Sequence, residues 1–446
     1  MRHADHEKRE MQTITDGLKN HPLALFADFR RLFVGRLISA VGDKFFSIAI
    51  AWWVISKSGD SAKFQLGLVM AVTVIPVVLF GPVLGTLVDR SDKRRVMLLA
   101  DAARALCVFV LAWLLYADRL TLPALYALCF LIAAFGPLFE SAVSSSIVRL
   151  TSPEKLAGAT ATDASVMQLS SVAGSALGSV LMAVVGVAGA FLFNAVSYLA
   201  SFFAILFIRT DLRPAGSASL NNSFAGPRPF EALAKKDGRN DASAYMTELR
   251  DGLNYVLKSR PLLALLCVFA AFNFFIGPLL ILIPMIVQFT LKESVTWLAV
   301  FETFFALGST VTSVAASFRK TYASVYGTFF RSVLFLGLSF GGLCFTADKY
   351  AICALLFAAG AALGVGNTAA LTLFQHAVPE EMKGRFFAVL TTICYAVLPL
   401  TFMVNGMLAE KFSVGFCIAF NAMAVLAISC VILLIPRLKV RVGGEN

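Results

Sequence analysis

The sequence predicts an all-α membrane protein in which twelve spanning helices form two pseudo-symmetric bundles of six. Three observations lead to this fold class. The 446 residues are 58% hydrophobic and only 15% charged, which is more apolar surface than one soluble core can bury. The apolar residues gather in twelve runs, each near the roughly 20 residues that a helix needs to cross a bilayer. A polar stretch separates the first six runs from the last six.

The composition also argues against several classes of function. The net charge is +11, and in so apolar a chain we assign the excess cations to loops that meet anionic lipid on the cytoplasmic side, with no nucleic-acid partner. The eight cysteines lie in apolar runs without a Cys-x-x-Cys pair, which argues against disulfides and metal sites. Phosphate-binding loops and nucleophile elbows are missing from the sequence, so we expect neither an ATP-driven pump nor an enzyme.

The elements follow in order along the chain. Residues 1–28 are polar and of mixed charge, which is unlike a secretory signal and predicts a cytoplasmic segment. The apolar runs that follow are each long enough to span a bilayer as a helix. The expected spans are residues 29–55, 65–88, 94–116, 122–148, 164–185, 187–209, 262–288, 294–316, 324–345, 350–373, 385–408 and 413–435.

The distribution of basic residues orients these spans. Basic residues on the side of the amino terminus are Arg30, Arg31, Arg90, Lys93, Arg94, Arg95, Arg149, Lys155, Arg319, Lys320, Lys383, Arg385, Arg437, Lys439 and Arg441. Those in the opposite loops are Lys57, Lys63, Arg119, Lys292, Lys349 and Lys411. The positive-inside rule therefore predicts that both termini are cytoplasmic. The expected location is a bacterial inner membrane.

The stretch between the sixth and seventh spans divides the chain into halves. Residues 211–243 are rich in Pro, Gly, Ser and Asn and predict a flexible linker. Tyr245, Leu249, Leu253 and Val256 then recur at helical spacing, which predicts an amphipathic helix on the cytoplasmic membrane face. The predicted units are an amino-terminal segment (1–28), a six-helix bundle (29–209), a linker with its helix (210–260), a second bundle (261–436) and a tail (437–446).

The two halves repeat one short motif. Residues 153–158 read Pro-Glu-Lys-Leu-Ala-Gly after the fourth span, and residues 379–384 read Pro-Glu-Glu-Met-Lys-Gly after the tenth. Proline, glutamate and glycine coincide, with a large apolar residue at the fourth place. The equivalent positions of the motif favour an internal duplication.

The first span carries the most informative polar face. Arg36, Ser39, Asp43 and Ser47 are spaced three, four and four residues apart and share one side of a helix. A carboxylate at the centre of a span costs on the order of 3 kcal/mol, so Asp43 is expected to face a cavity or a partner. It is either a functional acid or the structural partner of a nearby cation. Lys44 points about a hundred degrees away from it.

Two further acids lie within spans. Glu140 in the fourth span has about the depth of Arg36, so the two can form a pair, which is either structural or a switch that protonation breaks. Glu302 in the eighth span either binds a cation or proton or lines an outer vestibule. Asp101 and Arg104, one turn apart in the third span, are interpreted as a structural pair.

Uncharged polar residues mark the second half. Asn273 in the seventh span and Asn367 and Gln375 in the tenth are candidate substrate-binding residues. Thr368 and Thr372 share a face with Gln375. Such side chains contact substrate or hold helices together, and the second use is the commoner one.

Residues 85–95 form a basic turn between the second and third spans. Gly85 allows close helix approach, Asp89 can face the positive end of a neighbouring helix, and Arg90 and Arg94 can neutralise it or bind phospholipid head groups. The simpler interpretation is an ordinary positive-inside loop. We interpret the turn as a gating loop, because a Gly-x-Leu-x-Asp-Arg pattern at a span junction is more than that loop needs.

These motifs resemble those of the major facilitator superfamily over nearly the whole chain. Residues 80–95, followed by Asp101, are similar to its macrolide-efflux branch. That branch and the enterobactin-type exporters also share a Pro-Glu-x-x-x-Gly-Arg turn, which here runs from Pro379 through Gly384 to Arg385. The step at residues 41–43 also resembles lysophospholipid transporters and, more faintly, ferroportins.

Two residues depart from the family pattern. The general loop signature has glycine where this chain has Asp92, which fits the macrolide-efflux branch. The antiporter signature of the fifth span has Gly-Pro where this chain has Gly174 and Ser175, which weakens the case for proton antiport.

The resemblance implies a transporter in which spans one, four, seven and ten line a central cavity. We expect a proton-coupled exporter of a mid-sized amphipathic compound, such as a macrolide-like drug or a siderophore, that works by rocker-switch alternating access. The proton gradient would drive a monomer without a bound cofactor. The alternatives are a lysophospholipid flippase or small-molecule importer of the same fold and, from another class, a membrane sensor that does not transport.

Overall fold

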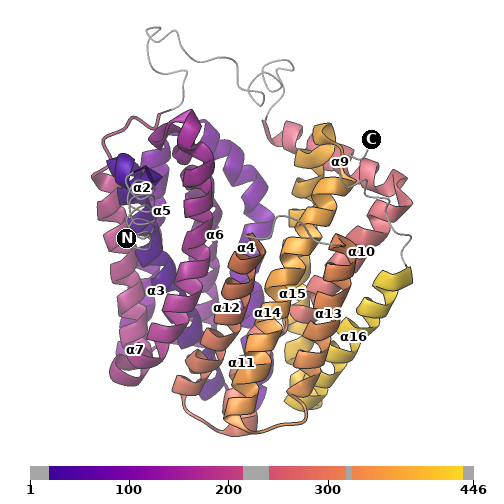
Figure 1. The fold of residues 1–446 in the computed structure, drawn as a ribbon. Helices are drawn as coiled ribbons and strands as arrows, with labels where there is room; N and C mark the ends of the chain where they lie inside the picture. The colour runs from indigo at the N-terminus through magenta and orange to yellow at the C-terminus, as the bar shows by residue number, and fades with distance from the viewer. Residues whose placement is uncertain (1–19, 214–240, 318–323, 435–446) are drawn as a thin grey trace, which may run out of the picture.

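A computed structural model describes residues 20–213, 241–317 and 324–434. The rest of the expected amino-terminal segment, most of the expected linker and the expected tail lie outside the described residues. Within the described ranges the regular secondary structure is helical (Figure 1). The helices of the amino half are α2 (Pro22–Leu25), α3 (Ala27–Lys57), η1 (Gly59–Ser61), α4 (Ala62–Asp89), α5 (Lys93–Tyr116), α6 (Leu122–Leu150), η2 (Pro153–Lys155) and α7 (Leu156–Leu206).

The carboxy half follows the amphipathic helix α9 (Asp241–Lys258). Its helices are α10 (Arg260–Ile276), α11 (Leu279–Met285), η3 (Ile286–Leu291), α12 (Val295–Ser317), α13 (Val325–Gly342), α14 (Lys349–Ala377), α15 (Glu380–Lys411) and α16 (Val414–Leu434). Short polar side chains start several of them. Asp92 accepts from the backbone N–H of Arg94 at 3.0 Å, and Asp348 accepts from that of Ala351 at 2.9 Å, which satisfies donors that a helix leaves unpaired at its first turn.

The helices of the described residues confirm the predicted fold class. Ten helical segments are long and apolar enough to span a membrane. They include Val184–Leu206, the second part of α7. Gly186 breaks α7 into two helices with φ 66° and ψ −169°, a conformation that only glycine adopts readily. The first part of α7 and the 18-residue α13 lie alongside these segments and correspond to the expected fifth and ninth spans.

The seventh span differs from the single run expected over residues 262–288. It is divided at Gly277 and Pro278 into α10 and α11. Pro278 has no N–H to donate to the carbonyl of Phe274, and the Thr401 hydroxyl of α15 donates to that carbonyl instead. A broken helix is tolerated at membrane depth when a neighbouring helix satisfies the freed group in this way.

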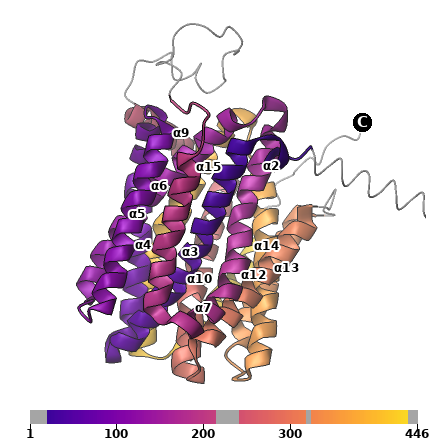
Figure 2. The same cartoon turned by 90° about the vertical axis from the view of Figure 1, so that its left-hand side faces the viewer.

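The two halves lie side by side with their helices across the same slab (Figures 1 and 2). The chain leaves the amino half at Arg213 and returns at Asp241 on one end of the bundle, at the top of Figure 1, and we name this end the linker face. The opposite end, which holds η1, is the far face. Because α3 starts on the linker face and each crossing reverses direction, α4 ends there again at Asp89.

Near the far face the halves meet closely between α4 and α15. Gly67 packs against the backbone of Phe402, and Gly406 lies against Gly67, where side chains would not fit. Toward the linker face the two helices enclose a groove of about 460 Å³. Its lining consists of Val77, Val78, Gly81, Phe387, Ala388, Thr391, Thr392 and Tyr395.

The helix predicted over the end of the linker is α9, and it packs on α15, α10 and α4. Val256 is buried, whereas Leu253 remains exposed. Gly252 lies against the Arg385 backbone, and Arg385 forms an ion pair with Asp251 at 3.6 Å. The side chains of residues 241–249, which include Tyr245 and Leu249 of the expected apolar stripe, lie outside the described residues.

Candidate functional site

A cavity of about 510 Å³ lies in the amino half among α3, α5, α6 and α7. It holds most of the ionisable residues that the sequence analysis selected from the first four spans. Its lining residues are Arg36, Ser39, Ala40, Asp43, Lys44, Arg104, Gly136, Phe139, Glu140, Met167, Gln168, Ser170 and Ser171. Arg36, Asp43 and Glu140 therefore share one space, as expected from their depth and spacing. Lys44 shares it as well, so the cavity covers a wider part of α3 than one helical face.

Arg36 forms the ion pair with Glu140 that the sequence suggested. Its Nη2 lies 2.5 Å from Glu140 Oε2, and its Nη1 donates to Asp163 of α7. The arginine side chain is 8% exposed and that of Glu140 is 54% exposed, so one partner is buried and the other reaches the open cavity. Asp163 is thus the third member of this charged cluster. Sequence reasoning missed it, because the fifth span was expected to begin only at residue 164.

Asp43 is held by two donors from the second part of α7. The Tyr198 hydroxyl donates to Asp43 Oδ1, and Asn194 Nδ2 donates to the same oxygen at 3.5 Å. Close approach of the helices makes this possible, since a Cβ at Gly42 would collide with Ser197 and Asn194. The sequence signal was present but unused: Asn194 and Tyr198 are four residues apart in an apolar run and so share a helix face.

Arg104 is also part of the cavity, although the sequence suggested only a structural pair. The pair with Asp101 is present, with Nη2 2.5 Å from Asp101 Oδ1. The guanidinium also lies 4.5 Å from the ring centroids of Phe139 and Tyr198. The bundle thus places a buried cation within the walls of the cavity that contains Asp43.

Glu302 of α12 lies at the contact between the two halves. The Ser175 hydroxyl of α7 donates to Glu302 Oε2 at 3.4 Å. Gly174 permits this arrangement, because a Cβ there would collide with the Lys44 side chain. The serine that replaces the proline of the antiporter signature therefore joins α7 to the acid of the other half.

Comparison with known proteins identifies the family. The model of the Major Facilitator Superfamily matches residues 32–401, which is most of the chain. The chain belongs to this superfamily. It is therefore a multi-pass membrane transporter, which confirms the resemblance drawn from residues 80–95.

Relatives of known name include exporters. The chain is 20% identical over 416 residues to macrolide efflux protein A of Streptococcus pyogenes, covering 92% of this chain and 96% of that protein. It is 24% identical over 411 residues to the multidrug efflux pump Tap of Mycobacterium bovis, covering 90% and 91%. Among solved structures, the nucleoside transporter NupG has a TM-score of 0.70 at 12% identity, covering 92% of this chain and 99% of that chain, which supports the fold alone.

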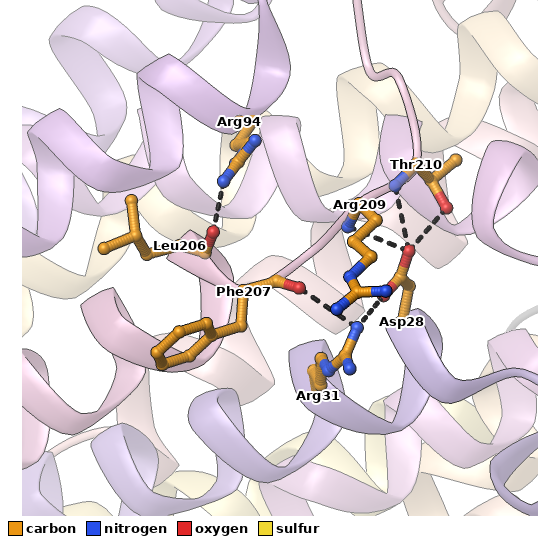
Figure 3. A network of polar contacts seen from close by, with 7 residues as sticks. All are labelled: Asp28, Arg31, Arg94, Leu206, Phe207, Arg209 and Thr210. Atoms are coloured by element: carbon orange, nitrogen blue, oxygen red, sulfur yellow. Dashed lines mark hydrogen bonds and ion pairs between the residues drawn. The ribbon is translucent and has the colours of Figure 1, made fainter.

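In this member of the superfamily the basic turn after α4 contacts its own half of the molecule. Arg94 donates to the carbonyl of Leu206 at the end of α7 (Figure 3). A cation at the carboxyl end of a helix satisfies its last carbonyls and interacts favourably with the helix dipole. Arg90 is exposed. The surroundings of Gly85 and the side chain of Asp89 are not among the described features, so the gating role of these two residues stays a prediction.

A second set of contacts continues this network toward the start of α3. Asp28 Oδ2 accepts from the backbone N–H groups of Arg209 and Thr210 at 3.0 and 2.9 Å and from the Thr210 hydroxyl at 2.7 Å. Arg31 donates to Asp28 and to the carbonyl of Phe207 at 3.0 Å (Figure 3). The amino half is thereby tied together at the point where the linker departs.

The candidate residues of the carboxy half lie outside this cavity. Asn273 donates to the carbonyl of Phe269 on its own helix at 2.8 Å, and Asn367 and Gln375 are exposed on α14. They do not join Asp43 and Glu140 in one lining, because the cavity is built within the amino half. In the second family turn, Gly384 has open space around it, and Arg385 contacts α9.

Sequence reasoning missed a buried amide network in the carboxy half. Asn421 Nδ2 donates to Asn405 Oδ1 at 2.6 Å, and Asn405 Nδ2 donates to the carbonyl of Thr401 at 3.0 Å. Both asparagines are fully buried. In the described ranges, no group of three His, Cys, Asp or Glu side chains is arranged to hold a metal ion.

Proposed function

We propose that this transporter is a proton-coupled exporter of a mid-sized amphipathic compound, with the proton gradient as its driving force. The observation that carries the proposal is Asp43, an acid at mid-span that faces a cavity and is held by Tyr198 and Asn194. An ionisable residue in a span is costly, and functional use is the usual reason for its presence. Both of these donors are uncharged, so neither of them neutralises the carboxylate of Asp43.

The substrate class that we propose is a macrolide-like drug or a siderophore. Two relatives over nine-tenths of the chain are named as macrolide and multidrug efflux proteins, which favours the drug. The cavity of about 510 Å³ is lined by apolar side chains such as Phe139 and Met167 beside its charges, which suits a compound with both characters. Moving one charge down a membrane potential supplies about 2.3 kcal/mol per 100 mV.

Alternating access would follow from the contacts between the halves. In our proposal the close α4–α15 contact near the far face separates while the groove toward the linker face closes. We place the linker face and both termini in the cytoplasm of a bacterial cell, on the charge distribution of the loops. The protein would act as a monomer in contact with anionic lipid and would catalyse no reaction.

The test is proton flux in proteoliposomes that contain a pH-sensitive dye. Erythromycin and the siderophore enterobactin are added in turn to vesicles with the parent protein or with Asp43→Asn. Proton movement that a substrate triggers in the parent and that Asp43→Asn lacks would support coupling through this acid. Substrate movement that ignores both the pH gradient and the substitution would contradict the mechanism and favour a facilitator or a lipid flippase.

A further inference from the structure

Arg104 of α5 is buried in an unusual setting for a cation. It is 6% exposed, and its guanidinium lies 4.5 Å from the ring centroids of both Phe139 and Tyr198. Nη2 donates to Asp101 at 2.5 Å, whereas Nε has no hydrogen-bond partner within the described residues. A cation between two aromatic faces is stabilised by the ring quadrupoles without being neutralised. The Arg104 guanidinium thus contacts the carboxylate of Asp101 and, on its planar faces, the rings of Phe139 and Tyr198.

Tyr198 connects this cation to Asp43. The ring face of Tyr198 contacts the Arg104 guanidinium, and its hydroxyl donates to Asp43 Oδ1. Arg104 and Asp43 also line the same cavity. Tyr198 thus contacts the arginine with its ring face and the acid with its hydroxyl group.

The cavity contains two other cations, Arg36 and Lys44. Arg36 donates to both Glu140 and Asp163, and the Lys44 side chain packs against Gly174 of α7. Arg104 of α5 is paired as well, with Asp101, but it also contacts the ring of Tyr198, whose hydroxyl donates to Asp43. The ionisable groups around that acid are Arg36 and Lys44 of α3, Asp101 and Arg104 of α5, Glu140 of α6, and Asp163 and Tyr198 of α7.

We propose that Arg104 is a positioning residue for Asp43. Held against the Tyr198 ring, its charge stabilises the carboxylate form of Asp43 and so determines the pH at which this acid takes up a proton. The physical reason is that a nearby positive charge favours the charged form of a carboxyl group. The inference rests on the proposed function, in which Asp43 is the coupling acid.

The experiment measures the protonation of Asp43 without any substrate. Dicyclohexylcarbodiimide modifies carboxylic acids in their protonated form, and mass spectrometry of the purified full-length protein reports labelling of Asp43 as a function of pH. In Arg104→Gln we expect the pH at half-maximal labelling to rise by about one unit, because the carboxylate loses its cation. Arg104→Lys, which keeps the charge, is expected to restore the midpoint toward that of the parent.

Two further variants separate this role from a structural one. Arg104→Gln leaves Asp101 buried without its partner, which can prevent folding. The comparison of Asp101→Asn with the double variant Asp101→Asn/Arg104→Gln reduces this problem, because the amide oxygen introduced at position 101 can still accept from Arg104, and the double variant removes both buried charges of the pair. The double variant is expected to label Asp43 with the higher midpoint. Arg331→Gln removes an exposed arginine from α13 as a matched control, with an unchanged midpoint.

Equal midpoints in Asp101→Asn and the double variant would overturn the proposal, and a purely structural Arg104 predicts that result. Because labelling needs no transport, its outcome is independent of the erythromycin experiment. A shifted midpoint in a protein that moves no proton would keep the Arg104–Asp43 relationship and reject the export mechanism. Substrate-triggered proton movement together with an unshifted midpoint would support the export mechanism and reject the Arg104–Asp43 relationship.

Discussion

The two halves share one architecture but differ in the chemistry of their buried polar groups. Among the described residues the buried charged side chains are those of Arg36, Lys93, Asp101 and Arg104, all in the amino half. The carboxy half instead buries amides and hydroxyls, with Asn405 and Asn421 at its centre. Amides keep one charge state at every physiological pH, whereas carboxyl groups can gain and lose protons. In the function that we propose, the amino half therefore holds the proton-responsive acid Asp43 and the carboxy half acts mainly as a scaffold.

The largest expected effect comes from removing the acid at the centre of the amino half. Asp43→Asn is expected to abolish the response of erythromycin accumulation to a pH gradient, because an amide cannot carry the proton. Accumulation is measured in vesicles with and without the gradient. Asn421→Ala is the control from the other half. It is expected to cost about 1–3 kcal/mol of stability through the orphaned Asn405, with an unchanged pH response. The opposite pattern would refute the division of roles.

A smaller effect is expected from Arg36→Gln. Glu140 and Asp163 would then face each other without a cation, which we expect to destabilise the protein by about 2 kcal/mol. This is below the full cost of breaking a buried pair, since Glu140 is partly exposed. The loss should shrink toward acidic pH, because a protonated carboxyl group needs no counter-charge. Thermal unfolding in detergent at several pH values measures it, and a loss independent of pH would show that Arg36 acts through packing.

The hinge of α7 provides a third comparison. Gly186→Ala is expected to lower the free energy of unfolding by about 1–2 kcal/mol, since a backbone with φ of 66° and ψ of −169° is strained for any residue that has a side chain. Gly384→Ala in α15 is the matched substitution in the other half, where a Cβ meets open space. It is expected to be neutral or to stabilise the helix by up to about 1 kcal/mol. Thermal unfolding compares the two. Loss of transport by a stable Gly384→Ala variant would reveal a gating role for the second family turn.

The smallest effect is expected where the halves meet. Ser175→Ala removes the hydroxyl that donates to Glu302 at 3.4 Å, and membrane hydrogen bonds of this kind average about 0.6 kcal/mol. Stability should therefore hardly change. Transport rates decide whether the contact controls the motion between halves: we expect a modest change in rate with an unaltered pH response. A loss of proton coupling as complete as the loss in Asp43→Asn would indicate that Glu302 belongs to the proton site.

Much of the site was predictable from helical spacing and depth. Asp43 and Arg36 share a face of α3, and the similar depth of Glu140 in the membrane indicated that Glu140 can pair with Arg36. Asp163 and Tyr198 were not predicted. Asp163 lies about two turns into α7, in a polar stretch that precedes the apolar run. Tyr198 contacts Asp43 because α7 is broken at Gly186 and packs on α3.

The sequence alone determined the all-helical fold class, because a chain in lipid must satisfy its backbone hydrogen bonds within each span. Hydropathy and the signals of glycine, proline and charge are local, so they can be read along the chain. Tertiary structure alone decided that Arg104 lies against Tyr198 and that Asn367 and Gln375 stand apart from Asp43. Such neighbours depend on which faces of distant helices pack together, and close contacts at residues such as Gly42 set that packing.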